Sequence, residues 1–148
     1  MAESLAITQY IDIHASRLQV WEVLLDLAAY NDWNRHIRVE QAPSRMGVGA
    51  QARFCAAPGA PHERMFIAEF LQVAAPAVLE WRGGEPGVFQ GMHHFELQEL
   101  GPNQTRLVNS EAFSGEMAVA ILHMSRAVLE EEFSAFNRAL KMRVETGR

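Results

Sequence analysis

The 148-residue chain is poor in the residue types that mark several protein classes. Its single cysteine, Cys55, excludes an intramolecular disulfide and a cysteine-rich zinc site, which suits a reducing compartment. No apolar run approaches the roughly 18 residues of a membrane span. The N-terminus lacks the basic and apolar regions of a signal peptide. We therefore expect a cytoplasmic protein that does not insert into membranes.

Positive charge and the common catalytic or nucleotide-binding motifs are also scarce. Thirteen lysines and arginines against 18 acidic residues give a formal net charge of −5, whereas nucleic-acid binders carry basic stripes. There is no P-loop, dinucleotide glycine fingerprint, G-x-S-x-G or H-E-x-x-H motif. His14, His62 and His123 have no carboxylate or cysteine at metal-ligand spacing. We expect no nucleic-acid partner, no metal and no cofactor.

The residues that are present describe one globular domain spanning residues 1–148. Hydrophobic residues make up 49% and charged residues 21% of a chain long enough for one domain and short for two. Weak alternation over Leu5–Ile13 predicts a strand. Ser16 then occupies an N-cap position before a short helix with apolar residues at helical spacing, and Asp26–Trp33 predicts a second short helix.

The middle of the chain predicts a series of antiparallel strands. The extended runs are Ile37–Gln41, Ala50–Ala56, Glu63–Val73, Val78–Arg82, Val88–Leu100 and Gln104–Phe113. The segments that join them, such as APGAP, GGEPG and GPN, have the glycine and proline content of hairpin turns. Strands joined in succession by short turns form an antiparallel meander.

The C-terminal part, from Ser114 to about Glu145, predicts one long helix. Apolar residues fall on a stripe at helical spacing: Ala118, Ile121, Leu122, Val128, Leu129, Phe133, Phe136 and Leu140, with Ser125 interrupting it. An apolar face of this length has to be buried, so the helix must lie across the sheet. The fold class is therefore α+β.

Two adjacent histidines, His93 and His94, lie within one predicted strand and so point to opposite faces of the sheet. His93 shares the apolar face with Phe95, which directs it toward the helix, and His94 faces solvent. This arrangement excludes chelation of one metal by the pair. A turn at Gly101–Asn103 pairs His93 with Glu111 and Phe95 with Asn109 on the inner face.

The order of elements and several motifs resemble the START-like helix-grip proteins, the SRPBCC or polyketide cyclase/dehydrase-like superfamily. The matching segments are VWEVLLDLAAYNDWN (20–34), LEWRG (79–83), GMHHFEL (91–97), TRLVNSEAFSG (105–115) and NRALK (137–141). One departure is Arg35, which stands where members often have a proline, and it puts the rigidity of that loop in question. The resemblance implies a curved sheet of about seven strands around the long helix, enclosing a cavity.

The resemblance leaves three functions open. The first is binding of a small apolar or amphipathic molecule, including lipids, between sheet and helix. The second is a cyclase or dehydratase-type enzyme acting on a polyketide-like substrate, in which His93 or Glu111 moves a proton. The third is a co-chaperone-type interaction module with a filled core. A second copy of the chain, forming a homodimer, is a further candidate partner.

The candidate ligand-binding residues combine polar groups and aromatic walls. They are Trp81, His93, Phe95, Asn109, Glu111, Phe113, Phe66, Phe70 and Ser125. Each also has a simpler interpretation, because aromatic residues on strands are usually core and a buried Glu111 could merely accept a hydrogen bond from His93. A turn at Gly83–Gly87 places Trp81 beside Phe89. His36, with Arg35 and Arg38, forms a small basic spot that could meet an anionic head group.

Overall fold

The computed structural model describes residues 5–147, and its elements follow the order that the sequence predicts. The chain begins with β1 (Ala6–Ile13), α1 (Arg17–Leu25), the 3-10 turn η1 (Leu27–Ala29) and α2 (Tyr30–Trp33). The strands β2 (Ile37–Gln41), β3 (Gln51–Ala56), β4 (Arg64–Ala74), β5 (Val78–Glu85), β6 (Phe89–Gly101) and β7 (Gln104–Ser114) follow, and then α3 (Ala118–Thr146). The α+β prediction is confirmed.

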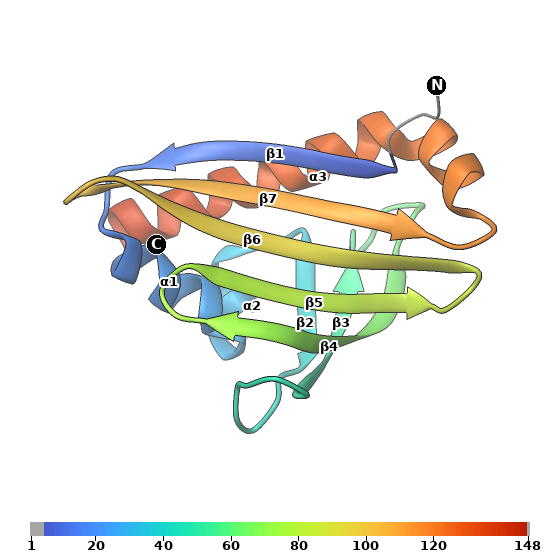
Figure 1. Ribbon diagram of the computed structural model, residues 1–148, viewed down its shortest axis with the longest axis horizontal. Helices are drawn as coiled ribbons and strands as arrows, with labels where there is room; N and C mark the ends of the chain where they lie inside the picture. Colours follow the sequence, from blue (N-terminus) through green and yellow to red (C-terminus); the bar gives the residue numbers. More distant parts are fainter. Residues whose placement is uncertain (1–4, 148) are drawn as a thin grey trace.

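The seven strands form one antiparallel sheet in the order β1-β7-β6-β5-β4-β3-β2. β2 to β7 make the predicted meander, and β1 joins the sheet beside β7. The sheet curls strongly, so that β2 and β3 run nearly across the direction of β6 (Figure 1). α3 packs against β1 and β7, which gives the helix-grip arrangement.

Local sequence signals explain where the short helices begin and end. Ser16 caps α1 through a capping box, because its hydroxyl accepts from the backbone N–H of Gln19 at 3.2 Å and the Gln19 side chain accepts from Ser16 N–H. After α2, the buried side chain of Asn34 donates to Ile37 O at 2.8 Å and accepts from His36 N–H at 2.9 Å. These bonds order the loop that holds Arg35, where the proline is missing.

The long helix begins four residues later than the sequence predicts. Ser114 still belongs to β7, and Gly115 has a φ of 107° in the turn that follows it. The helix ends before Gly147, which takes the left-handed conformation that closes many helices. Within residues 5–147, no helix combines the length and apolar character needed to cross a membrane.

The buried side chains form two clusters. The larger lies among α1, α2, the middle strands and the C-terminal half of α3, and includes Tyr30, Trp81, Phe95 and Leu140. The smaller joins β1 and β7 to the N-terminal half of α3 through Ile7, Phe113, Ala118, Leu122, Leu129 and Phe133. Because the core is divided in this way, α3 is fixed at both ends by different sets of contacts.

One predicted pairing within the sheet is wrong. β5 continues through Gly83 and Gly84 to Glu85, so the turn to β6 is shorter than predicted. Trp81 therefore faces His93 on β6, and Phe89 faces Glu85. The sequence pattern predicted that the turn begins at Gly83, whereas Gly83 and Gly84 both take part in the β5–β6 ladder.

Candidate functional site

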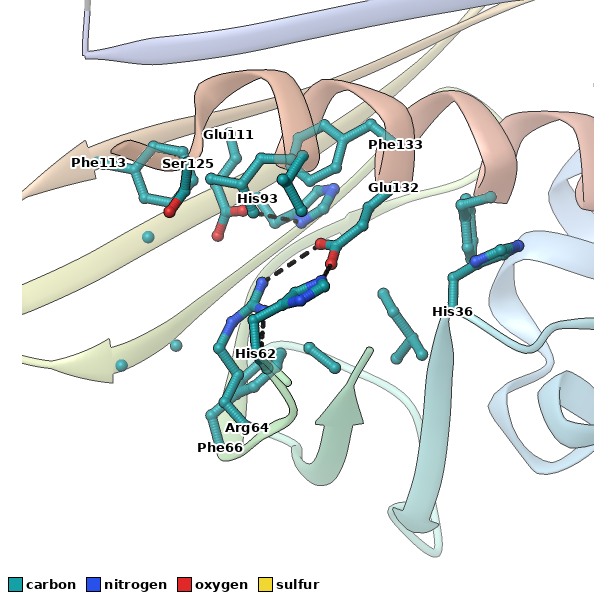
Figure 2. Close-up of a pocket in the computed structure, with 18 of the residues that line it drawn as sticks. His36, His62, Arg64, Phe66, His93, Glu111, Phe113, Ser125, Glu132 and Phe133 are labelled. Atoms are coloured by element: carbon teal, nitrogen blue, oxygen red, sulfur yellow. Dashed lines mark hydrogen bonds and ion pairs between the residues drawn. The ribbon is translucent and has the colours of Figure 1, made fainter. Parts of the chain in front are cut away.

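A cavity of about 420 Å³ lies between the inner face of the sheet and α3 (Figure 2). Aromatic side chains from three strands and the helix form most of its surface: Phe66, Phe89, Phe95, Phe113, Phe133 and Phe136. Members of both core clusters are among them. The cavity thus occupies the space where the two clusters approach each other under the helix.

Seven of the nine candidate residues line this cavity. They are Phe66, His93, Phe95, Asn109, Glu111, Phe113 and Ser125. Trp81 and Phe70 do not; both are fully buried and pack against each other with ring centroids 5.7 Å apart. Trp81 instead packs behind the cavity wall, where its ring centroid lies 4.9 Å from that of His93 and 5.1 Å from that of Phe95.

The two adjacent histidines point to opposite faces, as their alternation predicts. His93 is 5% exposed and lies on the inner face opposite Glu111. On the outer face, His94 Nδ1 lies 2.7 Å from Glu80 Oε2 on β5. The sheet therefore carries two histidine–glutamate pairs, one beside the cavity and one toward solvent.

His93 belongs to a polar chain that crosses from the sheet to α3. Its Nε2 lies 2.6 Å from Asn109 Oδ1, and Asn109 Nδ2 donates to Asn137 Oδ1 on the helix at 2.9 Å. All three side chains are buried. The interpretation that His93 donates a hydrogen bond to Glu111 is therefore wrong: the donor group of His93 is directed to Asn109.

Glu111 sits beside the other nitrogen of the same ring. Glu111 Oε1 lies 3.6 Å from His93 Nδ1, longer than a hydrogen bond (Figure 2). Burial lowers the pKa of His93 to about 4, partly offset by the Asn109 hydrogen bond. Burial also raises the pKa of Glu111 to about 7, although Arg64 acts in the opposite direction. At neutral pH the contact is consequently not an ion pair, because the imidazole is uncharged.

The space for the Glu111 carboxyl group depends on Gly91. A β-carbon at position 91, which faces Phe113 across the ladder, would overlap the Oε2 atom of Glu111. Any other residue at this position would displace the carboxyl group or the strand. Gly91 is thus a site residue that sequence reasoning missed, since a glycine inside a strand gave no sign of its neighbour.

The rim of the cavity carries an ionic cluster that the sequence also did not predict. His62 Nε2 lies 2.5 Å from Glu132 Oε1 on α3, and Arg64 is 3.6 Å from the other Glu132 oxygen. Figure 2 shows Glu132 reaching from the helix toward both side chains. His62 and Glu132 are 70 positions apart, so no local signal could join them. This cluster ties the start of β4 to α3 at the opening.

His36 also lines the cavity near its rim, and burial lowers the pKa of its imidazole. Its neighbours in the predicted basic spot, Arg35 and Arg38, are outside the lining, and Arg38 is bonded to Glu40 at 2.6 Å. Among residues 5–147, no group of three or more histidine, cysteine or acidic side chains is arranged to hold a metal ion.

A curved sheet gripping a long helix over an aromatic-walled cavity defines the helix-grip class of ligand-binding domains. Residues 4–145 match the family described as polyketide cyclase/dehydrase and lipid transport. The chain belongs to this family, and the resemblance seen in the sequence is confirmed. A search of curated proteins found no match.

Solved structures with the same fold include an aromatase/cyclase and proteins of other descriptions. The Zhui aromatase/cyclase from Streptomyces sp. R1128 is 22% identical, with a TM-score of 0.75 over 95% of this chain and 93% of that one. A START superfamily protein from Mycobacterium smegmatis is 19% identical, with a TM-score of 0.73 over 97% and 99% of the two chains. The protein TTHA0849 from Thermus thermophilus is 14% identical, with a TM-score of 0.77 over 96% and 98%. At these identities the likeness establishes the fold alone.

Proposed function

We propose that the protein binds a small apolar or amphipathic molecule in the cavity between the curved sheet and α3. The observation that carries this proposal is the cavity itself, about 420 Å³ in volume with walls made largely of phenylalanine. Ligand sites usually occupy ~300–1,000 Å³ and combine apolar walls with a few well-placed polar groups. The family description, which names lipid transport, supports the same role.

Within this proposal, the apolar part of the ligand contacts Phe66, Phe95 and Phe113. Its polar group meets the polar side chains of His93, Asn109 and Glu111, and we call this part of the cavity the buried end because His93 and Asn109 are only 5% and 1% exposed. Asn109 and Glu111 share the inner face of β7, and His93 faces Glu111 from β6. Ser125 adds a hydroxyl group from the helix. Trp81 and Phe70 keep the wall rigid from the second layer, since both are fully buried behind it.

Acid–base catalysis of the cyclase or dehydratase type is the second candidate, and one observation favours it. Glu111, with a pKa of about 7, lies beside the uncharged His93 in a cavity. A carboxyl group that titrates near neutral pH can both give and take a proton. The Zhui protein, which shares the fold, is described as an aromatase/cyclase. If Glu111 is catalytic, Glu111→Gln should lower turnover without weakening ligand binding.

The third candidate, an interaction module, required a filled core, and the cavity does not favour it. The proposal also keeps the expectation of one cytoplasmic domain over residues 1–148, for which the free, buried thiol of Cys55 is the supporting observation. A homodimer is a further candidate state. Light scattering of the purified protein measures its mass directly and tests that point.

The first test is native mass spectrometry, comparing gentle and denaturing conditions for a co-purified small molecule. We expect an extra mass that is lost on denaturation. Ser125→Leu should remove it, because the larger side chain projects into the cavity. Ala127→Leu is the matched control, since Ala127 is exposed on the same helix and lies outside the lining.

The outcome that contradicts the proposal is equally concrete. It is the absence of a bound mass, together with a melting temperature that no member of a ligand panel changes. The panel should include fatty acids, sterols, aromatic polyketides and amphipathic amines, so that each charge type is represented. A ligand that binds Ser125→Leu as tightly as the unchanged protein would place the binding site elsewhere.

A further inference from the structure

The buried end of the cavity presents hydrogen-bond acceptors that have no donor. Among residues 5–147, no group donates a hydrogen bond to the Glu111 carboxyl oxygens, and His93 Nδ1 lies 3.6 Å from Oε1, beyond hydrogen-bond distance. The side chain is 18% exposed and lines the cavity, so its free oxygens face that space. An unpaired buried carboxyl group is costly, and Gly91 is what makes room for it.

The polar chain fixes His93 so that it adds another acceptor. Asn109 Nδ2 donates to Asn137, which turns Asn109 Oδ1 toward the ring of His93. His93 Nε2 therefore carries the proton and donates it to Asn109. Because the buried imidazole is neutral, its Nδ1 has only a lone pair to offer. Above pH 7, where Glu111 is mostly ionised, two acceptors, Glu111 Oε1 and His93 Nδ1, thus face each other with no protein proton between them.

The charge balance and the walls point to the same kind of ligand. The lining contains two carboxyl groups, Glu111 and Glu132, and one arginine, Arg64, which already contacts Glu132. Apart from the histidines, the described lining therefore carries more negative than positive charge when Glu111 is ionised, which disfavours an anion. Phe89 and Phe113, which also line the cavity, form a stacked pair with centroids 5.2 Å apart, and aromatic faces attract cations.

From this geometry we infer that the site selects amphipathic ligands that carry a protonated amine, with the ammonium group between Glu111 and His93 Nδ1. An ammonium group supplies three donors, no acceptor and the charge that a carboxylate lacks. The apolar part of the molecule then extends along the phenylalanine walls toward the rim. This inference rests on the proposed binding function and narrows it to one ligand class.

Proton linkage gives the inference a second signature. Below pH 7 the unliganded Glu111 is mostly protonated, so an ammonium ligand must displace that proton. Affinity should fall by about tenfold per pH unit below 7 and level off above it. The charged and titratable groups that face Glu111 are His93 on β6, Arg64 on β4 and Glu132 on α3. His62 and His36 lie farther away, at the rim.

The experiment compares three probes of one shape by isothermal titration calorimetry: 2-naphthylethylamine, 2-naphthylethanol and 2-naphthylacetate. At pH 8 we expect the amine to bind about tenfold or more tightly than the alcohol, and the carboxylate most weakly. Glu111→Gln should remove this preference. Glu80→Gln, on the outer face and bonded to His94, should keep it.

The outcomes separate this inference from the binding function on which it rests. Equal affinity for amine and alcohol, or a preference that survives Glu111→Gln, overturns the amine inference while leaving the binding site intact. If none of the probes binds, the amine inference fails, and the binding function is still decided by native mass spectrometry and the ligand panel. Should Glu111→Gln not fold, the unchanged protein still decides: amine affinity that does not weaken between pH 8 and pH 6 overturns the inference.

Discussion

Replacing Glu111 by glutamine should make the folded protein more stable above pH 7 and leave it almost unchanged at pH 4.5. Burial raises the pKa of Glu111 from 4.5 to about 7, so ionisation at pH 8 occurs at the expense of stability. At 1.36 kcal/mol per pKa unit, the free energy of unfolding lost to this carboxyl group is up to about 3 kcal/mol. Glutamine keeps the shape and cannot ionise, so it recovers that energy.

The direction of the pH dependence follows from proton counting. Because the folded-state pKa of Glu111 lies above the unfolded value, the folded protein holds more protons between pH 4.5 and 7. Its stability therefore falls as the pH rises through that window. His93 has the opposite shift, from 6.5 to about 4, so its contribution is lost as the pH falls from 6.5 to 4. Between pH 4.5 and 6.5 the two slopes oppose each other in the unchanged protein.

The assay is urea unfolding of Glu111→Gln and the unchanged protein at half-unit steps from pH 4.5 to 8. The difference in unfolding free energy isolates Glu111, because other groups titrate alike in both. We expect it to grow from near zero to about 3 kcal/mol. Glu80→Gln is the control, since the partly exposed pair of Glu80 and His94 should contribute less than about 1 kcal/mol. A difference that is constant with pH, or a glutamine variant that is less stable at pH 8, would refute the reasoning.

Three further changes test other parts of the site. Asn109→Leu should lower the free energy of unfolding, measured in urea, by about 2–4 kcal/mol, because His93 Nε2 and Asn137 Oδ1 both lose their hydrogen-bond partner. A loss below about 1 kcal/mol would contradict the polar chain. Phe133→Ala should lower the free energy of unfolding by about 3–4 kcal/mol in the same assay, since the ring centroids of Phe133 and His93 lie 4.9 Å apart at the cavity wall. An unchanged free energy would mean that the wall collapses to fill the space. Glu132→Gln should change the free energy of unfolding by less than about 1 kcal/mol but increase the rate of ligand release in stopped-flow measurements, because it weakens the ion pairs at the rim. An unchanged release rate would show that the rim does not limit ligand exit.

Much of the fold could be predicted because strand alternation and turn residues are local signals. The register of β6 on β7 follows from one turn, and it correctly placed His93 opposite Glu111 and Phe95 opposite Asn109. The error at Trp81 has the same origin: two glycines that read as a turn are accommodated in the β5 ladder. Where a turn is ambiguous by a few residues, every partner after it changes.

The site was only partly predictable, because several of its contacts join segments far apart in the chain. The inner-face alternation found His93, Asn109 and Glu111, yet it could not reveal that Asn137 on α3 completes their chain. The partners of Glu132 at the rim likewise depend on how the sheet curls toward the helix. Nor could alternation tell wall from core, since Phe95 and Phe70 lie on equally apolar strand faces and only Phe95 reaches the cavity.

The hydrogen atom that serves as the side chain of Gly91 has an evolutionary consequence. A single base change converts a glycine codon to one for alanine, and the methyl group so added would occupy the place of Glu111 Oε2. The carboxyl group would have to turn away, and the buried end would keep only the uncharged polar groups of His93 and Asn109. A lineage carrying this fold could therefore exchange one ligand class for another by one mutation, at a position that contributes no functional group of its own.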